Sequence, residues 1–141
     1  MVSFIPRNVS NFFTPLNKAI AVKDNSMIER KRGVYNGRNK SSAYKDLVWT
    51  VATSSDISLD IKGQTQLTLE TIQKNLIELG SDKTKIVSAQ VYIADMNSKQ
   101  LMDLVWCEWF GNNPQDWPQR ACLGVALEGD VLIEITVTAV R

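Results

Sequence analysis

The chain has 141 residues, of which 44% are hydrophobic and 22% are charged, with a formal net charge of +1. This length suits one domain with a buried core, and no apolar run approaches the roughly 18 residues that a bilayer span requires, so we expect no membrane segment. The chain contains no histidine, which excludes Ser-His-Asp and Cys-His catalysis and histidine-ligated zinc. Any catalysis must therefore use carboxylates, arginine, lysine, hydroxyls, thiols or backbone groups, and we expect no metal and no cofactor.

The charge is unevenly distributed along the chain. Residues 1–45 hold nine basic and two acidic residues, a balance of +7, whereas residues 46–141 hold seven and thirteen, a balance of −6. We expect residues 1–26 to form an irregular basic extension and residues 27–141 to form a single domain. The extension has three interpretations: an arm packed on the acidic body, a nucleic-acid contact, or, for residues 1–23, a mitochondrial presequence. We expect a cytoplasmic protein, or a mitochondrial one if residues 1–23 act as a presequence.

The first half of the domain reads as strands followed by a helix. Residues 28–35 and 41–44 favour two short strands around a turn at Asn36-Gly37, and residues 47–53 are dense in strand-forming side chains. Residues 61–79 then show apolar side chains at helical spacing, and Gly80 follows as a C-terminal cap.

The second half predicts a strand, a helix and two more strands. Residues 86–93 form a strong strand pattern. A helix is expected from Asn97 to Phe110, with Gln100 at capping-box spacing. Two aliphatic runs then flank Glu128-Gly129-Asp130, which predicts a β-hairpin.

The predicted hairpin gathers polar residues on one face. If Leu127 pairs with Val131, then Arg120, Cys122 and Glu134 share a face, and apolar side chains occupy the other. Because two helices can cover only one face of the sheet, we expect the polar face to meet solvent or another subunit.

This polar group has two interpretations. Arg120 and Glu134 suit the solvated face of an antiparallel sheet. Alternatively, they form a pocket in which the guanidinium of Arg120 grips a carboxylate and Glu134 positions a water molecule. Cys122 is either a small buried hydrophobic residue or a thiol activated by Arg120.

Several stretches in order resemble the Rid (YjgF-like, reactive-intermediate imine deaminase) superfamily, and most of all its divergent YoaB-like branch. They lie between Gly63 and Arg141: residues 64–80, residues 86–96 with Val-Tyr-Ile-Ala-Asp-Met, residues 106–110, the Pro-x-Arg-x-Cys of residues 118–122, and Val-Leu-Ile-Glu-Ile of residues 131–135.

The resemblance implies a chorismate-mutase-like α/β (α+β) fold, with two helices on one face of a mixed β-sheet. It also implies a homotrimeric barrel with ligand clefts between subunits. In the deaminating members, the residue matching Arg120 binds the carboxylate of a 2-imino acid, that matching Glu134 orients water, and that matching Cys122 lines the cleft.

The chain departs from the family pattern at several site positions. No tyrosine matches the family's pocket tyrosine, the pocket serine is replaced within Val51-Ala52-Thr53, and an asparagine of the second helix becomes Asp103. We expect Val51 and Asp103 to line the substrate site, with Asp103 partly neutralising Arg120.

Three functions remain open at this point. The first is hydrolysis of small enamine or imine acids to 2-keto acids and ammonia, by positioning and electrostatics alone. The second is a non-catalytic module that binds small carboxylates such as 2-keto acids. The third is an RNA-acting protein, as some relatives carry an endoribonuclease label, but the acidic body argues against nucleic acid as a partner.

Overall fold

The computed structural model describes residues 27–141, so the predictions for residues 1–26 lie outside the described residues. Six strands and two α-helices follow one another along this part of the chain. Their order is β1 (Glu29–Arg32), β2 (Asn39–Tyr44), β3 (Leu47–Thr53), α2 (Ile61–Glu78), β4 (Ile86–Ile93), α3 (Lys99–Phe110), β5 (Gln119–Gly124) and β6 (Ile133–Val140).

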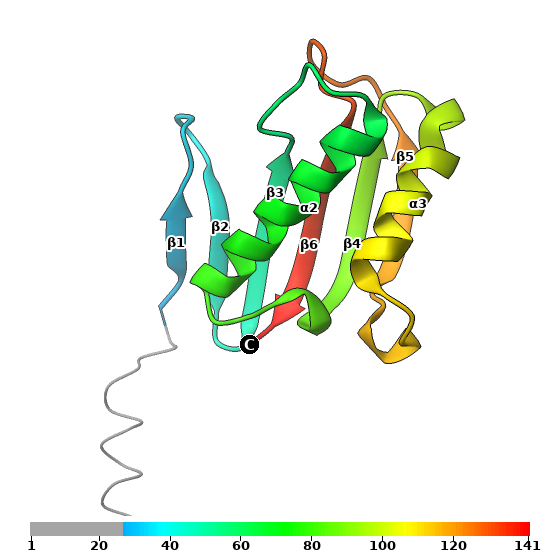
Figure 1. Cartoon of the computed structure of the whole chain (residues 1–141). Helices are drawn as coiled ribbons and strands as arrows, with labels where there is room; N and C mark the ends of the chain where they lie inside the picture. The colour runs from blue at the N-terminus through cyan, green and yellow to red at the C-terminus, as the bar shows by residue number, and fades with distance from the viewer. Residues whose placement is uncertain (1–26) are drawn as a thin grey trace, which may run out of the picture.

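The strands form one mixed sheet, with both helices on the same face (Figure 1). The spatial order is β1-β2-β3-β6-β4-β5, and every neighbouring pair is antiparallel except β4 and β5, which run parallel. This is the chorismate-mutase-like arrangement that the resemblance implied. Of the described residues, no helix is long and apolar enough to cross a membrane.

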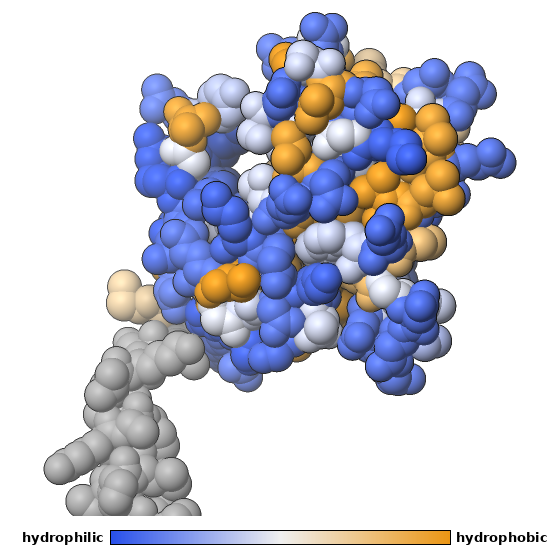
Figure 2. Space-filling view, viewed as in Figure 1, coloured by the Kyte–Doolittle hydropathy of each residue, from blue (hydrophilic) through white to orange (hydrophobic). Residues whose placement is uncertain are grey.

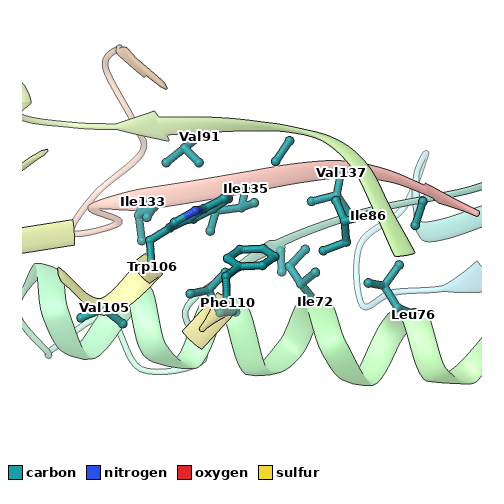
Figure 3. Packing of buried hydrophobic residues seen from close by; sticks show 14 of the residues in the cluster. Ile72, Leu76, Ile86, Val91, Val105, Trp106, Phe110, Ile133, Ile135 and Val137 are labelled. Carbon is teal, nitrogen blue, oxygen red and sulfur yellow. The ribbon is translucent and has the colours of Figure 1, made fainter. Parts of the chain in front are cut away.

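The core lies between this sheet and the two helices. Leu69, Ile72 and Leu76 come from α2, while Trp106 and Phe110 project from α3 toward the strands (Figure 3). The sheet supplies a matching layer of alternate residues that includes Val91, Ile133, Ile135 and Val137. Period-2 alternation on the strands and helical spacing on α2 therefore produce the same buried layer.

The C-terminal end of α2 forms as the sequence predicts, and its first turn has a cap that was not predicted. Asp60 accepts a hydrogen bond from the backbone N–H of Gly63 at 2.9 Å, which caps the first turn. Gly80 takes φ 84°, a left-handed conformation that suits a residue ending a helix.

The start of α3 differs from the prediction. A 3₁₀ turn at Met96–Ser98 precedes the helix, and it is the Asp95 side chain that accepts from the backbone N–H of Asn97. The predicted capping box of Asn97 and Gln100 is therefore wrong.

The predicted hairpin of the last two strands is also wrong. β4 lies between β5 and β6, so the two strands never pair. The parallel neighbour β4 sets the face of β5 residues: Arg120 pairs with Ala89 and Cys122 with Val91, both in the core layer. Arg120 and Cys122 therefore face the helices, whereas the hairpin prediction placed them on the uncovered face.

On β6 the predicted alternation is correct. Ile133, Ile135 and Val137 are buried beneath the helices, and Glu134 and Thr136 face the other way. Arg120 and Glu134 therefore lie on opposite faces of the sheet, not on one polar face.

The buried side chain of Gln64 joins the loop before α2 to the segment before β6. The amide nitrogen of Gln64 donates to the carbonyls of Ile57, Leu59 and Asp130 at 3.0–3.2 Å, and its amide oxygen accepts from the N–H of Leu132 at 3.0 Å. The loop before α2 and the segment before β6 are thus held together just ahead of Glu134.

Candidate functional site

The residues singled out by the sequence form two groups, one on each face of the sheet. Arg120, Cys122 and Asp103 lie on the helix-covered face, between β5 and α3. Glu134 and Val51 lie on the uncovered face, on the neighbouring strands β6 and β3.

Two residues of the first group, Arg120 and Asp103, line a pocket of about 350 Å³ at the edge where β5 meets α3. The pocket is lined by Asp103, Trp106, Cys107, Phe110, Gly111, Trp117, Pro118 and Arg120. Three of these residues are aromatic, so an apolar wall surrounds one ionic group. Pockets that bind small molecules commonly have this combination.

Arg120 is held in place from two directions. Its Nη1 donates to Asp103 Oδ1 at 2.8 Å, and its Cζ lies 4.9 Å from the ring centroid of Trp106. The arginine side chain is 20% exposed. Among the described residues, no acceptor takes Nε or Nη2, so one edge of the guanidinium remains for a ligand.

Asp103 binds a second cation through its other oxygen. Lys99, one helical turn earlier, donates from Nζ to Asp103 Oδ2 at 3.0 Å. Partial burial opposes ionisation of Asp103, but the hydrogen bonds from Arg120 and Lys99 outweigh it, and the pKa of the carboxyl falls below its usual value.

The net charge of this group therefore favours anions. Two cations, Lys99 and Arg120, surround the one carboxylate of Asp103. The prediction that Asp103 partly neutralises Arg120 is confirmed by the ion pair. Lys99 compensates for it, and the (i, i+4) spacing of Lys99 and Asp103 was the signal that sequence reasoning did not use.

Cys122 behaves as a packing residue. It packs against the core cluster, and burial raises the pKa of its thiol, although the nearby Arg120 charge opposes that shift. Such a thiol remains protonated at neutral pH, so activation of Cys122 by Arg120 is not supported.

The second group is too far from the first to share a small ligand with it in one chain. Glu134 pairs with Tyr92, three residues along β4 from Ala89, the partner of Arg120. The two positions are separated by roughly 10 Å along the strands and roughly 10 Å across them, on opposite faces. The structure therefore separates Arg120 from Glu134.

The face that carries Glu134 also exposes large apolar side chains. Leu47 pairs with Val140, and Trp49 lies one row away, opposite Thr138. Trp49, Leu47 and Val140 are 37%, 40% and 39% exposed. Neither helix covers this face (Figure 1). Grouped apolar residues on an uncovered sheet face are typical of a protein–protein contact.

The end of the sheet formed by β1 and β2, away from the Arg120 pocket, is polar and basic. Six of the nine basic residues of positions 1–45 lie on or between the strands β1, β2 and β3. On the helix side, hydrophobic surface gathers around α3, while the β1–β2 end is mostly hydrophilic (Figure 2). Much of the basic charge thus belongs to the sheet itself and not to residues 1–26.

Comparison with known proteins gives a consistent result. The model of the Endoribonuclease L-PSP family matches residues 49–141. The "Putative reactive intermediate deaminase TdcF" of Escherichia coli K12 is 30% identical over 89 residues, which cover 62% of this chain and 69% of that protein.

Solved structures agree with the sequence matches. A YjgF-family protein from Neisseria meningitidis superimposes with a TM-score of 0.76 and 26% identity, covering 84% of this chain and 98% of that one. E. coli TdcF with bound serine gives a TM-score of 0.71 and 27% identity, covering 82% and 98%. The residues that the family model matches include β5, β6 and α3, the elements that carry Arg120, Glu134 and Asp103.

Proposed function

The chain belongs to the Endoribonuclease L-PSP (Rid/YjgF) family, and from this we propose that it hydrolyses small 2-imino acids, or their enamine tautomers, to 2-keto acids and ammonia. The observation that carries the proposal is Arg120, a part-buried guanidinium with one edge available in an aromatic-lined pocket. A relative named as a deaminase and a neighbour solved with a bound amino acid support a small ligand of this class.

Arg120 anchors the substrate carboxylate. The planar guanidinium forms two parallel N–H bonds to a carboxylate, which fixes the position and the orientation of the acid. Asp103 and Trp106 hold the guanidinium from the other side, so little side-chain freedom is lost when the ligand binds.

The reaction needs no electron transfer. Water adds to the C2 carbon of the protonated imine, the C–N bond then breaks, and the C=O bond forms. The nitrogen leaves as ammonium, which carries both protons of the water. Because imines hydrolyse readily, placing the water and stabilising the charges is the main task left to the protein.

A second copy of the chain supplies the water-positioning carboxylate. Glu134 cannot reach the Arg120 pocket of its own chain, but it lies on the uncovered, partly apolar face that suits contact with another copy. We therefore propose a homotrimer in which each cleft combines Arg120 of one subunit with Glu134 and Val51 of the next.

A binding module without catalysis is the second candidate, and Cys122 and Val51 favour it. The thiol of Cys122 stays protonated, and Val51 has no hydroxyl where the family pattern implies a serine. The anion-binding part of the pocket is thus present, while the serine of the family pattern is missing and the thiol is not activated. In this case the ligand is a 2-keto acid or a similar small carboxylate.

Ammonia release from enzymatically generated 2-aminoacrylate tests the proposal. We expect wild-type protein to accelerate release, and Arg120→Ala and Glu134→Ala each to abolish the acceleration. Arg38→Ala, a change of the same type at an exposed position at the β1–β2 end, is the control and should retain activity.

Mixing the two inactive variants tests the shared cleft. After co-refolding of Arg120→Ala and Glu134→Ala chains, a cleft is intact only when its arginine and its glutamate come from different parents. We expect about a quarter of wild-type activity, because each contribution is intact in half of the chains. No recovery from the mixture would refute the shared cleft, whereas ligand binding without ammonia release by wild-type protein would favour the binding module.

A further inference from the structure

A second pocket, of about 330 Å³, lies between α2 and β2 on the helix-covered side of the sheet. It is lined by Lys40 from β2 and by Lys74, Asn75, Ile77 and Glu78 from the last turns of α2. Four strand spacings separate β2 from β5, so this pocket lies roughly 20 Å from the Arg120 pocket. No step of the proposed reaction uses it.

A buried hydrogen-bond network fixes the orientation of the Asn75 amide. Thr50 donates its one hydroxyl proton to the carbonyl of Lys40 at 3.1 Å and accepts from the hydroxyl of Ser41 at 2.8 Å. It also accepts from Nδ2 of Asn75 at 2.9 Å. Because the proton of Thr50 is already used, the amide of Asn75 must turn its nitrogen toward Thr50 and its oxygen away from it.

The amide oxygen of Asn75 is thus an acceptor that remains for a ligand. The residue is 4% exposed, and within residues 27–141 no donor reaches Oδ1, yet this atom is not sealed from solvent. Asn75 lines the pocket, so Oδ1 is the amide atom that a bound molecule meets. An acceptor that is almost buried needs a donor, and we expect the ligand to supply it.

The charged side chains beside Asn75 are only partly paired. Glu78 Oε1 lies 3.2 Å from Lys40 Nζ, whereas no residue within 27–141 pairs with Oε2. Lys74 precedes Glu78 by four residues, the weaker order for a helical ion pair, and no carboxylate of the described residues forms an ion pair with it. The pocket therefore presents one unpaired cation and two acceptors, Glu78 Oε2 and Asn75 Oδ1.

From this arrangement we infer that the pocket between α2 and β2 is a second binding site, for a free α-amino acid in its zwitterionic form. The ligand's ammonium group donates to Asn75 Oδ1 and Glu78 Oε2, and its carboxylate pairs with Lys74. An apolar side chain on the ligand lies against Ile77, which is 58% exposed. The inference rests on no part of the proposed function.

L-Leucine and two matched molecules test both charged groups of the ligand. The 2-keto analogue of leucine keeps the carboxylate and has no donor, and L-leucinamide keeps the ammonium group and has no carboxylate. Each molecule is titrated into the isotope-labelled full chain and followed by NMR. The side-chain amide signal of Asn75 locates the binding, and its shift against concentration gives the affinity.

We expect L-leucine to shift the Asn75 amide signal and to bind about tenfold more tightly than either analogue, because each analogue loses one charge-assisted contact. Lys74→Ala should weaken L-leucine binding by about tenfold for the same reason. Lys62→Ala removes the same charge from an exposed position near the start of α2 and should leave the affinity unchanged. Arg120→Ala, which changes the other pocket, should leave the Asn75 shift in place.

Three results would contradict the inference. Equal affinities of L-leucine and its 2-keto analogue would overturn the amino acid as ligand, because no donor is then recognised. An Asn75 signal that does not move at saturating L-leucine, or a shift that disappears in Arg120→Ala, would overturn the second site. Ammonia release enters none of these measurements, so failure of the proposed hydrolase activity is a separate result.

Discussion

Along β6, Ile133, Ile135 and Val137 point into the core, while Glu134, Thr136 and Thr138 point away from both helices. The helix-covered face is thus buried by helices of the same chain, and the Arg120 pocket lies at the edge of this face. The other face carries Glu134 and Val51 among exposed apolar residues, and no element between residues 27 and 141 forms a layer upon it. In the trimer that we propose, one chain builds the half of the site that anchors the ligand, and the uncovered face of a second chain supplies the other half.

The largest effect is expected from a charge on the uncovered face. Trp49→Glu places an unpaired carboxylate in the proposed contact, where burial would cost several kcal/mol. Light scattering should give the mass of one chain, 15.8 kDa, in place of about three times that value for wild type.

The matched control for this change lies on the helix side. Ile77 is an exposed apolar residue of α2, at 58% against 37% for Trp49. Ile77→Glu should leave the mass of the assembly unchanged. A monomeric wild type, or equal effects of the two substitutions, would remove the distinction between the faces.

A second comparison contrasts adjacent residues of β6. Ile135→Ala should lower the free energy of unfolding by about 2–4 kcal/mol, because it leaves a cavity in the packed layer. Thr136→Ala, on the other face, should cost less than about 1 kcal/mol, since within residues 27–141 the hydroxyl makes a single long hydrogen bond, 3.4 Å to the carbonyl of Thr50. Urea unfolding at one protein concentration measures both values, and similar losses would contradict the assignment of the faces.

The pocket itself is tested by ligand affinity. Arg120→Ala should weaken binding of 2-ketobutyrate by about 1.5–3 kcal/mol, because a charge-assisted pair of hydrogen bonds is lost. Arg120→Lys should restore only part of the affinity, since an ammonium cannot bind both oxygens in the same geometry. Calorimetry on Arg38→Ala provides the control, and equal affinities of wild type and Arg120→Ala would place the ligand elsewhere.

The smallest expected effect is the acid sensitivity of the Asp103 ion pairs. Because the pKa of Asp103 is lowered on folding, its contribution to stability is complete above the unfolded value of 3.8 and is lost as the pH falls through the folded value. The difference in unfolding free energy between wild type and Asp103→Asn should be at most about 1 kcal/mol near neutral pH, because the pairs are partly exposed.

Urea unfolding of both proteins at several acidic pH values measures this difference in unfolding free energy. It should shrink toward zero at the lowest pH values. A difference that stays constant through that range would show that the carboxylate charge contributes nothing to stability.

Local pattern was sufficient to predict most elements of the fold. The predicted strands at residues 47–53 and 86–93 match β3 and β4, and the predicted helix at residues 61–79 differs from α2 by one residue. These elements are long, and their apolar residues repeat with a single period.

Strand neighbours could not be read in the same way. Alternation along β5 divides its residues into two sets, but the set that faces the helices depends on which strand lies beside it. The short connection between β5 and β6 favoured a hairpin, whereas β4 lies between them. For this reason the sequence identified Arg120 and Glu134 but predicted them on one face of the sheet, whereas they lie on opposite faces.

The pocket depends on contacts across the sequence that no local pattern shows. Arg120 reaches Asp103 across 17 residues, and Trp106 was predicted neither as a pocket wall nor as a contact of the guanidinium. The departure at Asp103 was visible from the family resemblance, and its pairing with Lys99 from their (i, i+4) spacing, but its contact with Arg120 needed the packing of α3 against β5.

The central place of β6 has a consequence for how the protein folds during synthesis. Every other strand of the described sheet precedes β6 in the chain, yet β6 is the strand that joins β3 to β4. Until residues 133–140 leave the ribosome, β3 and β4 each expose an unpaired edge, which invites association with other chains. Sheet completion must therefore be late and built on distant contacts, and such topologies fold slowly. A nascent chain of this protein is thus expected to need chaperone protection for as long as its last strand is missing.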